Sequence, residues 1–454
     1  VTSGFHLLFA YILSGIYSAV HPDANGFVVS GVLVGMVFAL LTIAILLYWG
    51  LKRRNLLFLM FLALVITSQN FVYNTVSITE WAVGIFVSAS YCVWFFTRIK
   101  KDILGTADFI ILFILGLLGS VARSDSGILP FSLFSAVLLF FLLRQMSRRQ
   151  LLFALTGLVG TVGGLVVLFV HNYLFAGELL QSSARMKAYW GEFVPPGYYA
   201  APVLIGNLIG VLGLLLLAVL IGAVVWPRFF RKDGQETQEA QKALSPENKR
   251  QLSIMLLSSG ICLVGYTLFY SRGGGVQPWY SGNLIVPLLI FIYGLSTYLA
   301  LSLSERAIAV FGLLFAGAVT VNIISLYPAN SENSVWSYHT YLYEAGTYLS
   351  ENPQDSAVGA WNAGIIGYYE GGHVINLDGL VNKDIYPYAI NNDLSSYLAR
   401  QNIHYVLDFE RMITDKSYRL RGGYEDPDFI TSFVSEKMFD NGDYGLILYR
   451  VGGR

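Results

Sequence analysis

Five charged side chains stand at the borders of long apolar segments in this chain. Glu80 begins one such segment, Arg123 and Asp125 lie between two others in VARSDSGILP, and Lys187 and Arg272 follow two more. A charge next to lipid is costly unless it faces a cavity or a partner, so these residues are site candidates. Arg and Lys side chains are the usual ligands of phosphate. For Arg123 and Asp125 a purely local ion pair in a tight turn is the alternative.

Further polar and aromatic side chains stand at the same borders. These are Asn74, His171, Asn172, Trp279 and Tyr280, and His6 lies at the start of the first apolar stretch. Together with the Arg and Lys residues they suit an anionic ligand that carries sugar, because aromatic faces stack on sugar rings. The alternatives are a capping or snorkelling role for His171, an interfacial aromatic belt for Trp279 and Tyr280, and a solvated loop for Lys187.

The sequence lacks the patterns that would predict a metal site, a nucleotide site, a nucleic-acid surface or a disulfide framework. The six His residues have no ligand spacing, so no metal site is predicted, although a divalent metal remains compatible with the carboxylates. No phosphate-binding loop or dinucleotide fingerprint is present. The net charge is zero, which gives no basic surface for nucleic acid. The two cysteines, Cys92 and Cys262, both lie in apolar segments and do not indicate a disulfide framework.

The elements that must position these residues are long and apolar. Hydrophobic residues make up 55% of the chain and charged residues 13%, with a mean hydropathy of +0.57. A membrane span needs about 20 mostly apolar residues. We predict ten spans, near residues 27–49, 55–73, 78–97, 104–121, 127–143, 151–171, 201–226, 252–270, 281–303 and 306–326. Residues 4–20 are apolar but short, so a span and a helix lying at the membrane surface both remain open.

Lys and Arg occur in every second connection between these spans. The basic connections hold Lys52, Arg53 and Arg54, then Arg98, Lys100 and Lys101, then Arg144, Arg148 and Arg149, then six residues within 228–250, and finally Arg306. Positive loops face the cytoplasm. The connections that carry the site candidates, and the tail from residue 327, are therefore predicted to face outward across the cytoplasmic membrane.

The composition changes after the last span, and residues 327–454 are predicted to form an extracytoplasmic α/β domain beside the membrane domain of residues 1–326. Helical and strand patterns alternate there, as in VWSYHTYLYEAGTYLSE, SAVGAW and NAGIIGYYEGG. Loops at the carboxyl ends of such strands often bind ligands. Trp361, Asn362 and Asp378 follow two predicted strands, and we expect them to face the membrane domain and contact an acceptor. The alternative is that Trp361 packs the core and Asn362 caps a helix.

Pieces spread over nearly the whole chain resemble the bacterial integral-membrane glycosyltransferases of the GT-C superfamily, of the protein-mannosyltransferase and arabinofuranosyltransferase type. The matching pieces are TSGFHLLFAYIL, ITEWAVGIF, RSDSG, HNYLFAGELLQSSARMK, QPWYSG, GAWNAGIIGYY and VINLDGLVN. The resemblance implies transfer of a sugar from a polyprenyl-phosphate carrier to a glycan, lipid or protein outside the cytoplasm. It also favours a surface position for residues 4–20.

The resemblance implies roles for the site candidates. Arg123, Lys187 and Arg272 would bind the departing phosphate, while Asp125 and Glu80 would supply acid–base carboxylates. The key acidic residue of the family lies in a first outer loop, which would precede Val1, so we expect this chain to lack its natural N-terminus. A transporter or flippase of lipid-linked sugars and a non-catalytic cell-envelope assembly protein are the competing functions. An upstream acidic residue would favour the enzyme.

Overall fold

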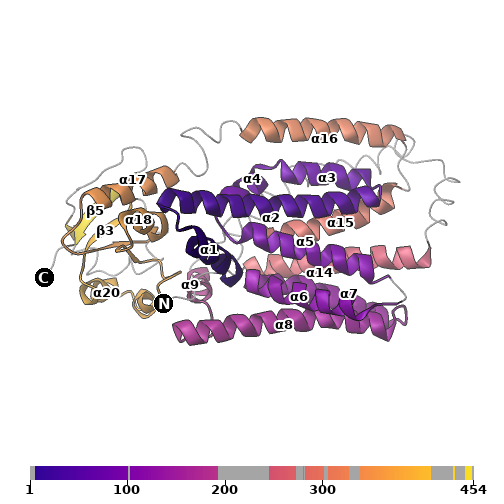
Figure 1. Ribbon diagram of the computed structural model, residues 1–454, viewed down its shortest axis with the longest axis horizontal. Coiled ribbons are helices and arrows are strands. Elements are labelled where there is room, and N and C mark those ends of the chain that lie inside the picture. The colour runs from indigo at the N-terminus through magenta and orange to yellow at the C-terminus, as the bar shows by residue number, and fades with distance from the viewer. Residues whose placement is uncertain are drawn as a thin grey trace.

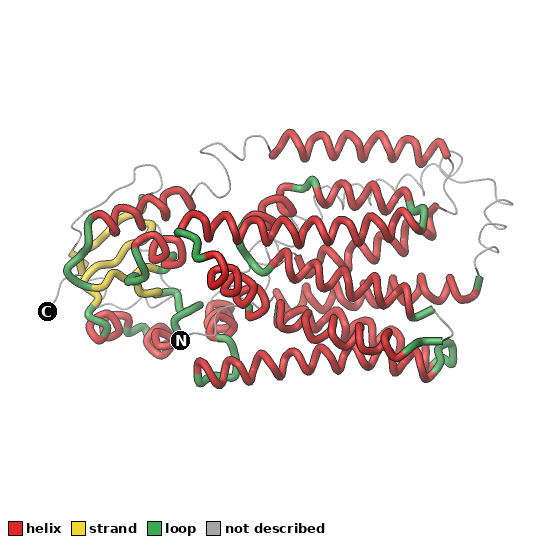
Figure 2. Tube along the Cα trace, viewed as in Figure 1, coloured by secondary structure: helices red, strands yellow, loops and turns green. Residues whose placement is uncertain are grey.

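The computed structural model describes residues 6–100, 103–192, 245–271, 280, 282–300, 305–326, 338–410, 433–434 and 445–451. These residues form a bundle of long helices with a small sheet domain at one end (Figure 1; Figure 2). The bundle contains α2 (Ala24–Lys52), α3 (Leu56–Ile66), α4 (Gln69–Val76), α5 (Trp81–Arg98), α6 (Thr106–Ala122), the short 3-10 helix η1 (Ser124–Gly127), α7 (Ile128–Leu142), α8 (Arg148–Ala176), α14 (Pro246–Ser271), α15 (Gly282–Ala300) and α16 (Glu305–Leu326). The shorter helices α1 (Leu7–Val20) and α9 (Ser182–Gly191) lie between the bundle and the sheet domain.

Among the described residues, a helix occupies each predicted span position except 201–226, which lies outside them. By length and composition four helical segments could cross a membrane, namely Ala24–Lys52, Ser124–Leu142, Arg148–Ala176 and Pro246–Ser271. The bent pair α3 and α4, with an angle of 57° between them, would make a fifth. Helices α1 and α6 and parts of α15 and α16 are apolar but shorter. The total of ten spans therefore stays a prediction.

Glycines in α8 set how closely this helix packs against α6. A Cβ atom added at Gly160 would collide with the backbone of Phe113, and one added at Gly164 would collide with the backbone of Leu117. Small residues let two helix backbones approach in this way, and membrane helices use them because lipid supplies no hydrophobic drive for packing. This contact fixes the end of α6, from which a candidate site residue projects.

The sheet domain has five strands in the order β2-β1-β3-β5-β4. The strands are β1 (Ala357–Ala360), β2 (Ile375–Asn376), β3 (Ile403–Phe409), β4 (Phe433–Val434) and β5 (Leu446–Val451). Strand β1 pairs in parallel with β2 and β3, whereas β5 is antiparallel to β3 and β4. The helical elements are α17 (Tyr338–Glu351), α18 (Ala363–Glu370), the 3-10 helix η4 (Lys383–Ile385), α19 (Tyr386–Ile390) and α20 (Leu394–Arg400). The α/β alternation expected from the sequence is confirmed.

Helix α9 completes one of the two hydrophobic cores of this domain. Its residues Met186, Tyr189 and Trp190 pack with Trp361 and with apolar side chains of α19, α20 and β3. The tight turn at Gly379, whose φ is +74°, packs directly against Met186, so a larger residue at position 379 would be strained and would also collide. A segment that precedes the sheet domain by well over a hundred residues therefore holds this domain against the bundle.

Candidate functional site

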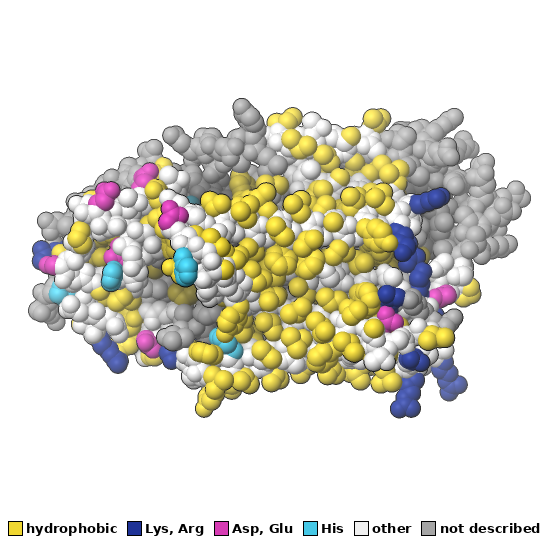
Figure 3. All heavy atoms as spheres, viewed as in Figure 1, with side chains coloured by type: hydrophobic (Ala, Val, Ile, Leu, Met, Phe, Trp, Pro, Cys, Tyr) yellow, Lys and Arg dark blue, Asp and Glu magenta, His cyan; other side chains and the backbone are white. Residues whose placement is uncertain are grey.

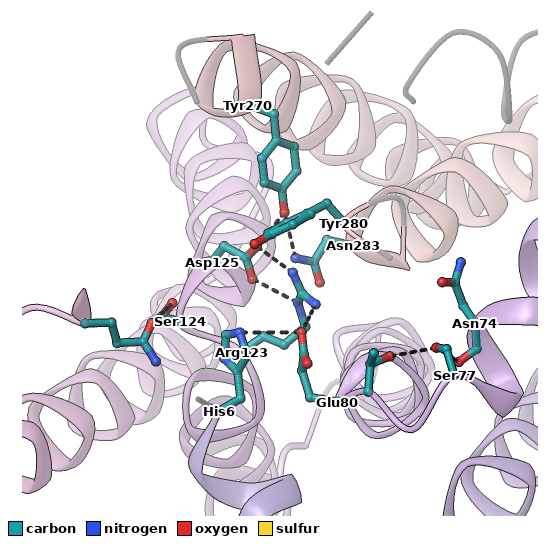
Figure 4. Close-up of polar contacts among 12 residues, drawn as sticks. His6, Asn74, Ser77, Glu80, Arg123, Ser124, Asp125, Tyr270, Tyr280 and Asn283 are labelled. Atoms are coloured by element: carbon teal, nitrogen blue, oxygen red, sulfur yellow. Dashed lines mark hydrogen bonds and ion pairs between the residues drawn. The ribbon is translucent and has the colours of Figure 1, made fainter. Parts of the chain in front are cut away.

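A buried arginine forms the centre of a polar cluster at the end of the bundle nearest the sheet domain (Figure 4). Arg123 is 1% exposed. Its Nε and one terminal nitrogen donate to the two carboxylate oxygens of Asp125, at 3.1 and 2.9 Å. Its other terminal nitrogen donates to Glu80, and its guanidinium lies 5.2 Å from the ring centre of Tyr280. The guanidinium is thus held between two carboxylates and an aromatic face.

Local chain geometry explains how these groups meet. Helix α6 ends at Ala122, and Arg123 has an extended backbone before the chain turns through η1, which brings the Asp125 carboxylate beside the guanidinium. Glu80 precedes the first residue of α5. One turn into α5, Gly84 leaves room for the arginine, because a Cβ atom at this position would lie 2.7 Å from Arg123 Cδ.

The two carboxylates differ in their surroundings. Asp125 accepts both bonds from the arginine and a further one from the hydroxyl of Tyr270, which in turn accepts from Asn283 Nδ2 at 3.0 Å. Glu80 also lies 3.4 Å from Nε2 of His6, and its side chain is 13% exposed. Asp125 is therefore enclosed by Arg123 and Tyr270, whereas Glu80, at 13% exposure, and His6, at 20%, are somewhat more exposed.

Lys187 on α9 extends the cluster toward the sheet domain. Its ammonium group donates to the hydroxyl of Tyr280, whose ring covers Arg123. The positive charge of Lys187 also acts on Asp378 of the sheet domain. Burial raises the pKa of Asp378 to about 6, against the opposing effects of bonds from Leu380 N–H and Asn376 and of this lysine. The bundle and α9 thus meet through the contact of Tyr280 with Lys187, and the charge of Lys187 extends to Asp378 of the sheet domain.

The two residues that follow β1 contact the interior of the sheet domain. Trp361 is 2% exposed and packs in the core, so its placement agrees with the core-packing alternative and leaves no ring face for a sugar. The Trp361 N–H and the Asn362 side-chain amide each donate to the carboxylate of Asp408 at 3.1 Å. Burial raises the pKa of Asp408 to about 7, while these bonds and one from Phe409 N–H oppose the rise. Asn362 therefore ties β1 to β3.

Other predicted site residues lie apart from Arg123. Asn74 bonds to Asn70 within α4 and lies apart from the arginine in Figure 4. His171 contacts the Tyr11 hydroxyl at 3.0 Å, and Asn172 donates to Leu179 O at 3.4 Å at the end of α8. These three contacts are explained by packing between or within helices. Arg272 and Trp279 lie outside the described residues.

Tyr270, Asn283 and Asp408 were not predicted as site residues from the sequence. Tyr270 directly precedes the SRGGG stretch, and Asn283 comes three residues after Tyr280, so both were adjacent to segments already singled out. Asp408 looked like part of an ordinary buried strand. Within the part of the chain that is described, no three His, Cys, Asp or Glu side chains are grouped to hold a metal ion. Arg123 occupies the space between Glu80 and Asp125.

Comparisons with known proteins give few matches. The model of a domain of unknown function (DUF8728) matches residues 332–449. A search of curated protein sequences finds no significant match. Among solved structures, the chain is similar to the archaeal oligosaccharyltransferase AglB from Archaeoglobus fulgidus, in complex with an inhibitory peptide and a dolichol-phosphate, with a TM-score of 0.48 and 14% sequence identity. The similarity covers 94% of this chain and 64% of that chain.

Proposed function

We propose that this protein is a membrane glycosyltransferase that moves a sugar from a polyprenyl-phosphate donor to a glycan, lipid or protein acceptor on the outer side of the cytoplasmic membrane. The observation that carries the proposal is the convergence of Glu80, His6, Arg123 and Lys187 where the helical bundle meets the sheet domain. Glycosyl transfer needs a carboxylate, a cation for the departing phosphate and a water-facing wall for the acceptor. The carboxylate of Glu80 and the ammonium group of Lys187 at this junction support the proposal.

The distribution of charge supports the proposed sidedness. Figure 3 shows Lys and Arg side chains gathered at the bundle end away from the sheet domain, with a broad apolar surface between the two ends. Positive residues stay on the cytoplasmic side of a membrane. The sheet domain and the Arg123 cluster would then lie outside, where no nucleotide is needed because the carrier lipid delivers the activated sugar.

Within this proposal, the more exposed Glu80 takes part in the reaction and the buried Arg123 positions it. Glu80, paired with His6, accepts the proton of the acceptor hydroxyl as that oxygen attacks the anomeric carbon. The bond from this carbon to the phosphate oxygen breaks, and the phosphate leaves with its negative charge. Arg123 is a positioning residue here, because two carboxylates already neutralise its charge and it is buried. This replaces its expected role as a phosphate ligand.

Lys187 is the cation proposed for the departing phosphate. It lies on a helix packed into the sheet domain, and its charge acts on both His6 and Asp378. Replacing it with alanine removes one charge-assisted contact, which is worth roughly 1.5–3 kcal/mol. Donor binding should therefore weaken about tenfold to a hundredfold. Lys187→Arg, which keeps the positive charge, should retain most of the affinity for the donor.

The test uses the whole protein in nanodiscs with a panel of radiolabelled polyprenyl-phosphate hexoses and pentoses, and it measures release of polyprenyl phosphate in the presence of cell-envelope acceptors. Glu80→Gln should lower turnover by roughly 10²- to 10⁴-fold and leave donor binding in place. Glu370→Gln, at the distant His373 pair, is the matched control. Turnover by Glu80→Gln at the parental rate, or no donor consumed from the whole panel, would refute the proposal.

A further inference from the structure

We infer that a cleft between α9 and the α19–α20 side of the sheet domain binds a sugar residue of a neutral glycan. The cleft has a volume of about 440 Å³, which lies within the usual range of ligand sites. Its walls come from the turn after α8, from α9 and from residues 383–401. This inference goes beyond the proposed transfer reaction and stands even if that reaction is wrong.

Tyrosine side chains line this cleft, and the two that are half-buried could contact a sugar. Tyr386 and Tyr388 are half-buried, and Tyr397 is buried beneath them. Tyr388 and Tyr397 meet edge to face with ring centres 5.3 Å apart. The guanidinium of Arg185 lies 4.2 Å from the ring centre of Tyr386, and Arg400 donates to the Tyr388 hydroxyl at 2.9 Å. The rings are therefore held in place before any ligand arrives, which lowers the entropy cost of binding.

The charges around the cleft are mixed. Arg185 pairs with Glu178 at 2.9 Å, and Asp384 acts electrostatically on Arg400. A site built for a bare anion would place cations together without carboxylates between them. Sugar hydroxyl groups both donate and accept hydrogen bonds, so they can pair with Arg, with Glu and Asp, and with the Gln401 amide. The chemistry favours a neutral, polyhydroxylated ligand over phosphate.

Hydrogen bonds hold the two walls of the cleft in place. Lys383 Nζ donates to the carbonyl oxygen of Ala176 at the end of α8, at 2.5 Å. Within the sheet domain, Asn382 Nδ2 donates to the Tyr397 hydroxyl at 2.7 Å. A cation at the carboxyl end of a helix is also favoured by the helix dipole. Since segments more than two hundred residues apart form this cleft, ligand binding there would strengthen the contact between the two parts.

Helix α9 separates this cleft from the Arg123 cluster. Lys187 reaches Tyr280 on one side of α9, while Arg185 reaches Glu178 and Tyr386 on the other. Two helix residues separated by one position point in nearly opposite directions. A glycan in the cleft would therefore occupy a site of its own, beside the proposed reaction centre.

The experiment measures binding of maltose, cellobiose and α-1,6-mannobiose to the whole protein by saturation-transfer NMR. Nanodiscs replace sugar-headed detergents, whose head groups would compete. No donor lipid is present, so a failure of the proposed transfer reaction cannot affect the outcome. We expect saturable binding of at least one disaccharide, an affinity at least tenfold lower for Tyr386→Ala and for Arg400→Ala, and little change for Tyr386→Phe. Tyr343→Ala, an exposed tyrosine on α17, is the matched control and should bind like the parent.

Three results would overturn the inference. The first is the absence of saturable binding for all three disaccharides. The second is binding that neither Tyr386→Ala nor Arg400→Ala weakens. The third is displacement of a bound disaccharide by inorganic phosphate at millimolar concentration, which would make the cleft a simple anion site. Arg400 is exposed, so Arg400→Ala keeps the test decisive should Tyr386→Ala fail to fold.

Discussion

The buried carboxylate of Asp408 should make the sheet domain less stable as pH rises. Asp408 is fully buried on β3 and holds β1 through the Trp361 N–H and the Asn362 amide. Its pKa is raised to about 7 in the folded domain, above the value of about 3.9 for an unfolded chain. Between these values the native state keeps a proton that the unfolded state has lost. Its contribution to stability is therefore complete below about pH 4 and is lost as pH rises through 7.

The magnitude follows from the two pKa values of the domain. From pH 6 to pH 8, Asp408 should lower the free energy of opening of the sheet by about 1.4 kcal/mol. Asp378, with a pKa of about 6, adds about 0.4 kcal/mol of the same sign. In Asp408→Asn, the free energy of opening should therefore fall between pH 6 and pH 8 only by the smaller amount that Asp378 contributes. In Asp378→Asn, the larger decrease that Asp408 contributes should remain. Asp408→Asn also leaves the Trp361 N–H without its acceptor, which lowers the free energy of opening at every pH. The diagnostic quantity is therefore the change of this free energy with pH and not its absolute value.

Hydrogen exchange can measure this slope in the whole protein in nanodiscs. Peptides covering β1 and β3 report the free energy of local opening at each pH, once the intrinsic pH dependence of exchange has been divided out. Peptides from the centre of α8 serve as the internal reference. Parallel curves for Asp408→Asn and the parent between pH 6 and pH 8, or a flat parental curve, would refute the reasoning.

Three further changes have definite expected outcomes. Gly160→Ala forces a side chain against the backbone of Phe113 and should lower stability to thermal unfolding by about 1–3 kcal/mol, whereas Gly163→Ala, whose nearest neighbour lies 4.0 Å away, should be nearly neutral. Equal melting temperatures for the two variants would contradict this packing. Asp125→Asn leaves a buried guanidinium short of one countercharge and should cost about 3–5 kcal/mol, so an unchanged unfolding transition would be inconsistent with the ion pair. A reporter that is active only in the cytoplasm, fused after Arg454, should stay silent, and a strong signal would reverse the proposed topology.

The sequence alone determined the positions of the elements. Apolar runs placed the helices of the bundle, because a run of about 20 mostly apolar residues is the pattern of a membrane-spanning helix. Short apolar runs placed β1 and β3, and helical patterns placed α18 and α20, because both kinds of pattern are local properties of the chain. Charge at or near the segment borders also singled out Glu80, Arg123, Asp125 and Lys187 as site candidates, and their roles stay a prediction.

Only the tertiary structure decided which of these residues meet. Arg123 reaches Glu80 across 43 positions, and Asp125 reaches Tyr270 across 145, contacts that depend on how each helix is rotated and how closely the glycines of α8 let it pack. His171 stands at a similar segment border but contacts Tyr11, because its position on α8 directs it toward α1. Helix α9 joined the core of the sheet domain and buried Trp361 there. Local periodicity determines which face of an element is apolar, but the partner of that face is set by packing between segments far apart in the chain.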